Sequence, residues 1–166
     1  MGLAGLVVDV AVRDEVRLLV DEQDALAVRV LGLLGGALEH PHVATVYDYW
    51  REPGRAYLVS RYLKGGSLAG LHDRGQRLDH DRASLVVEQV ASSLASAHRQ
   101  QVAHGRVGAS NVLFDGEGNA FLGDFNVGIG PEPDPADDVR ALAALAKDLL
   151  RERMPERLRD LVERAQ

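Results

Sequence analysis

Cysteine is absent from the 166 residues of the chain. This absence excludes disulfide bonds, thiolate metal sites and a cysteine nucleophile, and it fits a protein kept in a reducing cytoplasm. Basic residues are also outnumbered, since 19 Lys and Arg stand against 25 Asp and Glu, for a formal net charge of -6. A general nucleic-acid binder usually carries a clustered basic surface that displaces counterions from phosphates. We therefore expect no nucleic-acid partner.

Long apolar runs are missing as well. The apolar stretch at residues 1–12 carries Asp9 in its middle, has no basic flank on its N-terminal side, and is too short to span a bilayer. We therefore expect no membrane segment in this chain. Hydrophobic residues make up 46% of the sequence, which is enough to build the core of one domain of this length.

The first part of the chain predicts strands around an ambiguous segment. Residues 6–12 are rich in β-branched side chains and predict a strand. Residues 22–38 have the spacing of a helix, although part of them could also form a strand. Residues 43–50 and 56–62 predict a hairpin, because both are aromatic and β-branched and a Pro-Gly turn separates them.

Helices dominate the predictions for the middle of the chain. Ser67 is a plausible cap for a short helical piece. Residues 79–101 then place apolar side chains at the period of a long amphipathic helix. Two short strands, at 111–114 and 120–122, should flank a turn of small and polar residues.

The last part of the chain begins with a Pro-rich stretch at residues 130–136, which predicts a linker. Helices are expected after it at residues 137–151 and 155–166, the second with a proline in its first turn. The order of all these segments is an α+β pattern.

Short motifs follow one another along the chain in a fixed order. They include Glu39-His40-Pro41-His42-Val43, Tyr57-Leu58-Val59, Gly65-Gly66-Ser67-Leu68, Val102-Ala103-His104, Ser110-Asn111-Val112-Leu113 and Asp124-Phe125. Together they closely resemble bacterial serine/threonine protein kinases of the eukaryotic type over roughly residues 10–130. The resemblance implies a protein-kinase-like two-lobe fold, with a reduced N-lobe sheet at about 1–62 and a shortened helical C-lobe at 63–166.

The resemblance also identifies a changed catalytic loop. A protein kinase positions its substrate hydroxyl with an Asp in this loop, and an Asn of the loop together with a second Asp holds magnesium. The loop is identified here as residues 104–111, with Arg106 where the catalytic Asp belongs. An arginine cannot accept a proton at physiological pH. None of the catalytic residues is therefore intact.

The two magnesium-binding positions are kept in the sequence. Asn111 matches the Asn of the catalytic loop, and Asp124 matches the Asp of the Asp-Phe-Gly motif, whose Gly is replaced by Asn126. Asn111 and Asp124 are therefore candidate metal ligands, with the alternative that both only cap turns. Arg106 could instead pair with Asp124 and occupy the magnesium site.

The nucleotide-binding parts are reduced. Residues 10–13 resemble the strand that carries the ATP-binding Lys, with Arg13 in its place and Leu31 near the position of the partner Glu. A rival alignment puts Arg29 on that strand but leaves no room for the following helix. No Gly-x-Gly-x-x-Gly loop is present. Residual ATP contacts would come from Ala11, Arg13, Arg61, Leu63 and Leu113.

The chain after Asn126 is too short for an activation segment, and Asp138 follows at the expected start of the central C-lobe helix. The resemblance implies that Asp138 hydrogen-bonds the backbone of the catalytic loop, and that His104 supports the fold. We expect a catalytically impaired pseudokinase, a cytoplasmic regulatory or protein-interaction module with an unknown protein partner and no cofactor. The alternative is a kinase homologue that retains weak ATP and magnesium binding.

Overall fold

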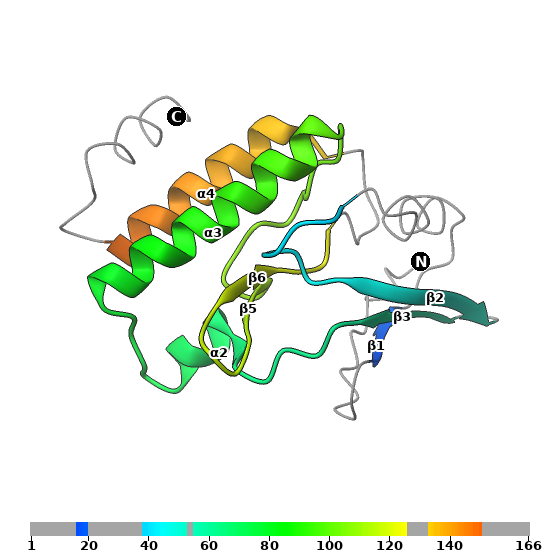
Figure 1. Ribbon diagram of the computed structural model, residues 1–166, viewed down its shortest axis with the longest axis horizontal. Helices are drawn as coiled ribbons and strands as arrows, with labels where there is room; N and C mark the ends of the chain where they lie inside the picture. Colours follow the sequence, from blue (N-terminus) through cyan, green and yellow to red (C-terminus); the bar gives the residue numbers. More distant parts are fainter. Residues whose placement is uncertain (1–15, 20–37, 53–54, 126–132, 151–166) are drawn as a thin grey trace, which may run out of the picture.

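The computed structural model of the protein describes residues 16–19, 38–52, 55–125 and 133–150. Strands β1 (Val16–Leu19), β2 (Val46–Glu52) and β3 (Arg55–Ser60) form an antiparallel sheet in the order β1-β3-β2 (Figure 1). A β-bulge between Val46 and Asp48 shifts the register of β2 against β3. The predicted hairpin is confirmed, although its first strand begins at Val46 rather than at residue 43.

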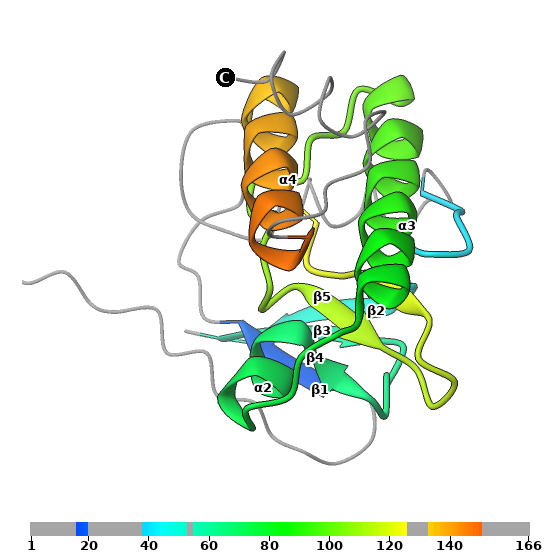
Figure 2. The ribbon, with the colours of Figure 1, turned by 90° about the vertical axis from the view of Figure 1, so that its left-hand side faces the viewer.

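A second, smaller sheet lies between the first sheet and the two long helices (Figure 1). Its strands are β4 (Gly66–Ser67), β5 (Val112–Phe114) and β6 (Ala120–Leu122), paired antiparallel in that order. The helices are α2 (Leu68–Asp73), α3 (His80–Arg99) and α4 (Pro135–Leu150). Figure 2 shows α3 and α4 side by side. This arrangement leaves the loop between α3 and β5 close to the start of α4.

Helix α3 forms where the sequence predicts it, because its capping residue and its apolar spacing agree. The carboxylate of Asp79 accepts a hydrogen bond from the N–H of Arg82 at 2.8 Å, which caps the first turn. Val86, Val90 and Leu94 recur at helical spacing and are buried. Gln101, with φ 60°, then turns the chain out of the helix.

The main core lies between α3 and the second sheet. Its members include Val90, Leu94, Val112, Phe114 and Leu122, together with Val43 from the segment before β2. That segment pairs with β6. The N–H of Ala44 donates to the carbonyl oxygen of Leu122 at 2.9 Å, and the N–H of Leu122 donates to that of His42 at 2.8 Å. These bonds join the first part of the chain to the second sheet.

The boundaries of other elements differ from the predictions in a few places. Helix α4 begins at Pro135, so Pro135 and Ala136 belong to the helix rather than to the linker. Proline suits a first helical turn, where its missing N–H would have no partner inside the helix. Strand β1 was not predicted, and the predicted elements at 6–12 and 155–166, with most of 22–38, lie outside the described residues. In the part of the chain that the structure describes, no helix is long and apolar enough to cross a membrane.

Candidate functional site

His104 anchors the loop that connects α3 to β5. Its side chain is fully buried, and its Nδ1 accepts a hydrogen bond from the N–H of Arg106 at 3.0 Å. The proton of the neutral ring is therefore on Nε2, which donates to the carbonyl oxygen of Gly123 at 2.8 Å. Because Gly123 directly precedes Asp124, this bond fixes the loop against the turn that presents Asp124.

The same burial sets the charge of His104. Its pKa is lowered to about 4, mainly by burial and to a smaller extent by the nearby Arg106, while the bond to Gly123 and the charge of Asp138 offset this lowering only in part. The ring packs against that of Phe125, with centroids 4.5 Å apart. Both ring nitrogens are engaged with the backbone, so His104 has no free nitrogen for proton transfer to a substrate. This agrees with the structural role that the sequence predicts.

Asp138 holds the catalytic loop from the first turn of α4. The residue is 1% exposed, and its carboxylate accepts hydrogen bonds from the N–H groups of His104 and Gly105, both at 2.7 Å. Nε2 of His98 donates to the same carboxylate at 2.8 Å. The prediction that Asp138 binds the backbone of the catalytic loop is therefore confirmed.

Gly105 lets the chain approach α4 closely. Its φ is +75°, and a Cβ at this position would lie 2.7 Å from Cβ of Pro133. A side chain here would meet both a strained backbone and the proline ahead of α4. Sequence reasoning missed this contact, because the approach of Pro133 to Gly105 depends on tertiary packing.

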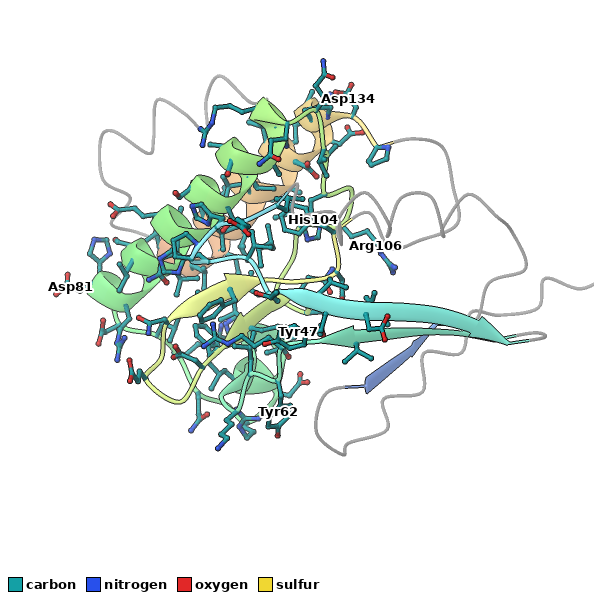
Figure 3. All side chains as sticks on the ribbon, turned by 45° about the vertical axis from the view of Figure 1, so that its right-hand side comes forward. Tyr47, Tyr62, Asp81, His104, Arg106 and Asp134 are labelled. Carbon is teal, nitrogen blue, oxygen red and sulfur yellow. The ribbon has the colours of Figure 1, made fainter. Side chains whose placement is uncertain are left out.

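Arg106 and Asn111 are joined within the loop. The side-chain Nδ2 of Asn111 donates to the carbonyl oxygen of Arg106 at 2.7 Å, and the backbone oxygen of Asn111 accepts from the N–H of Gly123 at 2.9 Å. The Arg106 side chain is exposed, and Figure 3 shows it extending away from the long helices. The structure thus brings Asn111 to Gly123, the residue that precedes Asp124, and joins Arg106 to Asn111.

Asp124 is half-buried and has a φ of 61°. This left-handed conformation is uncommon for a residue other than glycine, although Asp tolerates it better than most. Among the described residues no group of three or more His, Asp or Glu is arranged to hold a metal ion. A magnesium site at Asn111 and Asp124, and a pairing of Arg106 with Asp124, both stay predictions.

The residues proposed to contact ATP meet in one cluster as far as they are described. Leu63 is buried with Ala44 and Phe121, and Leu113 packs against them. The guanidinium of Arg61 lies over the Phe121 ring, 4.7 Å from its centroid. The remaining two candidates, Ala11 and Arg13, lie outside the described residues. Phe121 was predicted only as a strand residue. Its pairing with Leu113 across β5 and β6 brings it into the cluster.

Comparisons with known proteins agree with this arrangement. A family model described as the protein kinase domain matches residues 24–141. Serine/threonine-protein kinase PrkC of Bacillus subtilis is 31% identical over 91 residues, which cover 55% of this chain and 14% of PrkC. Serine/threonine-protein kinase PknH of Mycobacterium tuberculosis is 33% identical over 94 residues, which cover 57% of this chain and 15% of PknH. Aurora kinase A-B of Xenopus laevis is 31% identical over 88 residues, which cover 53% of this chain and 22% of the Aurora kinase. The matched region is thus less than a quarter of each relative.

Proposed function

We propose, on the premise that the chain belongs to the protein kinase domain family, that it is a catalytically impaired kinase-like domain acting as a regulatory or protein-interaction module. The observation that carries the proposal is the cation at the catalytic position. Arg106 stands between His104 and Asn111, and its backbone is bonded to both side chains. The loop around Arg106 is thus held in place, while the side chain that should accept a proton can only donate hydrogen bonds.

The chemistry of phosphoryl transfer supports this reading. A kinase works by positioning its substrates and by neutralising charge, and its loop Asp accepts the proton of the attacking hydroxyl. Loss of a positioned base typically costs about 10²–10⁴-fold in rate. A guanidinium near Asn111 and Asp124 would also repel a magnesium ion. Both effects act against catalysis.

Transfer of radiolabelled phosphate from ATP and magnesium, to the chain itself and to a general acceptor protein, tests the proposal. We expect no transfer above background, because no group at position 106 can take the hydroxyl proton. Transfer that disappears in Asp124→Ala would contradict the proposal. The Arg106→Asp variant is the informative companion, because it restores the missing base without altering Asn111 or Asp124.

The second candidate function is a homologue that keeps weak ATP and magnesium binding. The observation that favours it is the backbone hydrogen bond from the N–H of Gly123 to the carbonyl oxygen of Asn111. Because Asp124 directly follows Gly123, this bond holds the backbone of Asp124 near that of Asn111. A thermal-shift titration with ATP and magnesium separates the two candidates. A rise in melting temperature that is lost in Asp124→Ala would favour nucleotide binding, whereas an unchanged melting temperature would favour the interaction module.

A further inference from the structure

Exposed positive charge gathers in one stretch of this acidic chain, residues 61–78. The stretch contains four basic side chains, all exposed, namely Arg61, Lys64, Arg74 and Arg77, and a single acidic one, Asp73. The whole chain has a formal net charge of -6. Without the net +3 of this stretch, the remainder of the chain carries -9. Charge is therefore divided unevenly between this surface and the rest of the molecule.

The stretch folds into a compact piece that runs from the end of β3 through α2. The N–H of Gly65 donates to the carbonyl oxygen of Phe114 at 2.8 Å, and that of Gly66 donates to Leu63 at 3.2 Å. The segment carrying Arg61 and Lys64 is therefore turned back onto the second sheet, directly ahead of α2. Two exposed basic residues, Arg61 and Lys64, precede this turn, and two more, Arg74 and Arg77, follow α2.

Arg74 reaches back along α2 toward this turn. A guanidinium nitrogen of Arg74 lies 3.4 Å from the position that a Cβ on Gly70 would take, as does the hydroxyl of Ser67. Its Nε donates to the side-chain oxygen of Gln76 at 3.3 Å, which helps to hold this orientation. The charge of Arg74 is thus carried from the end of α2 back toward Ser67, the residue that caps its beginning.

Arg61 and Tyr62 add a feature typical of protein-binding surfaces. The guanidinium of Arg61 is oriented by the Phe121 ring, with 4.7 Å between them. Tyr62 is 47% exposed, and Figure 3 shows it at the outer edge of the molecule, away from α3 and α4. Arg and Tyr are enriched among the residues that dominate binding energy, and an oriented Arg loses less freedom on binding.

We propose that the basic surface of residues 61–78, formed by Arg61, Tyr62, Lys64, Arg74 and Arg77, is a docking surface for an acidic segment of a partner protein. This inference rests on the proposed function as a protein-interaction module, and it names the surface that binds the partner and the chemistry of the partner. Charge complementarity selects the partner, since an acidic peptide neutralises the four cations while its aromatic or aliphatic side chains cover Tyr62.

A long nucleic acid fits this surface less well than a short acidic peptide. Duplex DNA carries one negative charge per about 1.7 Å along its axis, so it would extend past the surface onto the rest of the chain. Within the described residues, that remainder has a formal charge of -5, and repulsion acts over a Debye length of about 8–10 Å at physiological salt. A short peptide can end where the positive surface ends.

Binding of a fluorescein-labelled, glutamate-rich peptide containing one tryptophan, followed by fluorescence anisotropy at low and high salt, tests the proposal. We expect salt-sensitive binding that weakens by about tenfold or more in the double variant Lys64→Glu with Arg77→Glu. The matched control is Arg99→Glu with Lys147→Glu, which reverses one Arg and one Lys on the exposed faces of α3 and α4. This control changes the net charge equally and should bind like the unmodified chain.

Several results would overturn the proposal. They are absence of peptide binding, equal weakening in the control, tighter binding of a single-stranded oligonucleotide of the same charge, and a dimer in light scattering that only the surface variant breaks. Circular dichroism of each variant establishes that it is folded. Failure of the surface and failure of the proposed function are distinguishable. If the chain transfers phosphate and also binds the peptide, only the proposed catalytic impairment is refuted. If it shows neither phosphate transfer nor peptide binding, only the proposed docking surface is refuted.

Discussion

At the scale of single residues, Asp138 connects α4 to the loop that carries Arg106. Replacing Asp138 by Ala removes the acceptor of two backbone N–H groups, those of His104 and Gly105. A buried donor left without a partner costs about 1–3 kcal/mol. We expect Asp138→Ala to lower the free energy of unfolding by about 3 kcal/mol, measured by urea denaturation.

The neighbouring Asp137 provides a matched control. It also lies in the first turn of α4, but it is 63% exposed and pairs only with Arg140 among the described residues. Both variants lose one negative charge near the same helix N-terminus. Asp137→Ala should therefore change stability by less than about 1 kcal/mol. Equal losses in the two variants would show that Asp138 acts through helix charge and not through the loop.

The buried His104 predicts loss of stability in acid. Its pKa is lowered from 6.5 to about 4, so between these pH values the unfolded chain takes up a proton that the folded chain refuses. Stability is thus fully present above pH 6.5 and falls as the pH drops toward 4, by about 3 kcal/mol in total. The lowered pKa of His40 acts in the same direction.

Urea denaturation across this pH range measures the effect. His104→Gln removes the titrating group, so its stability should depend less steeply on pH than that of the unmodified chain. His80→Gln, at an exposed position at the start of α3, is the control for loss of a histidine that is not buried. If His104→Gln and the unmodified chain lose stability in parallel, protonation of His104 is not the cause.

Arg106 gives a prediction about magnesium. If its guanidinium pairs with Asp124, Arg106→Ala should free that carboxylate, and magnesium should then raise the melting temperature of the variant alone. The cost in stability should stay below about 1 kcal/mol, because Arg106 is exposed. Arg77→Ala is the control for loss of an exposed arginine. Stabilisation of the unmodified chain by magnesium would show that no such pairing blocks the site.

At the scale of elements, the contact between Gly105 and Pro133 sets how closely α4 approaches the catalytic loop. Gly75 has a similar φ of +70° but nothing within 4 Å of a Cβ, whereas Gly105 faces Pro133. Both Gly→Ala variants acquire backbone strain, and only Gly105→Ala also acquires a steric overlap. We expect Gly105→Ala to be at least about 1 kcal/mol more destabilising than Gly75→Ala in urea denaturation.

A double-mutant cycle identifies the overlap. Pro133→Gly removes the atom that a side chain at position 105 would meet. The destabilisation caused by Gly105→Ala should therefore be smaller in the Pro133→Gly background than in the unmodified chain. Additive effects of the two substitutions would mean that backbone strain alone makes glycine necessary there.

Elements whose signals are local were predictable from the sequence. Helix α3 carries its own cap at Asp79 and its own apolar spacing, and the predicted range 79–101 differs from His80–Arg99 only at the ends. Strand β1 carries no such signal, since it forms by pairing Val16 with Val59, far along the chain.

In the candidate site, the order of the short motifs along the sequence was enough to identify Arg106, Asn111 and Asp124. The overlap at Gly105 depends on tertiary packing, which no local pattern contains.

At the scale of the whole molecule, the segment before β2 joins the two sheets. Val43 belongs to the main core and forms a parallel bridge with Leu122, while β2 and β3 continue from the same segment. The first sheet therefore loses its attachment when the core opens. We expect the described parts of the chain to unfold as one cooperative unit.

Two probes measure this cooperativity. The single tryptophan, Trp50, lies in β2 and reports on the first sheet through its fluorescence, while far-ultraviolet circular dichroism reports mainly on α3 and α4. Their urea transitions should have the same midpoint. A fluorescence transition at clearly lower urea would show that the first sheet melts by itself.

The pairing of residue 43 with residue 122 also has a consequence for the order of events during synthesis on the ribosome. The hairpin of β2 and β3 is complete once Ser60 has been made, but the partner of Val43 is made 62 residues after Ser60. At about 5–20 residues per second this interval lasts about 3–12 s. During that time the apolar side chains of Val43 and Ala44 lack the strand that buries them in the finished protein, and a nascent chain in this state offers them to chaperones.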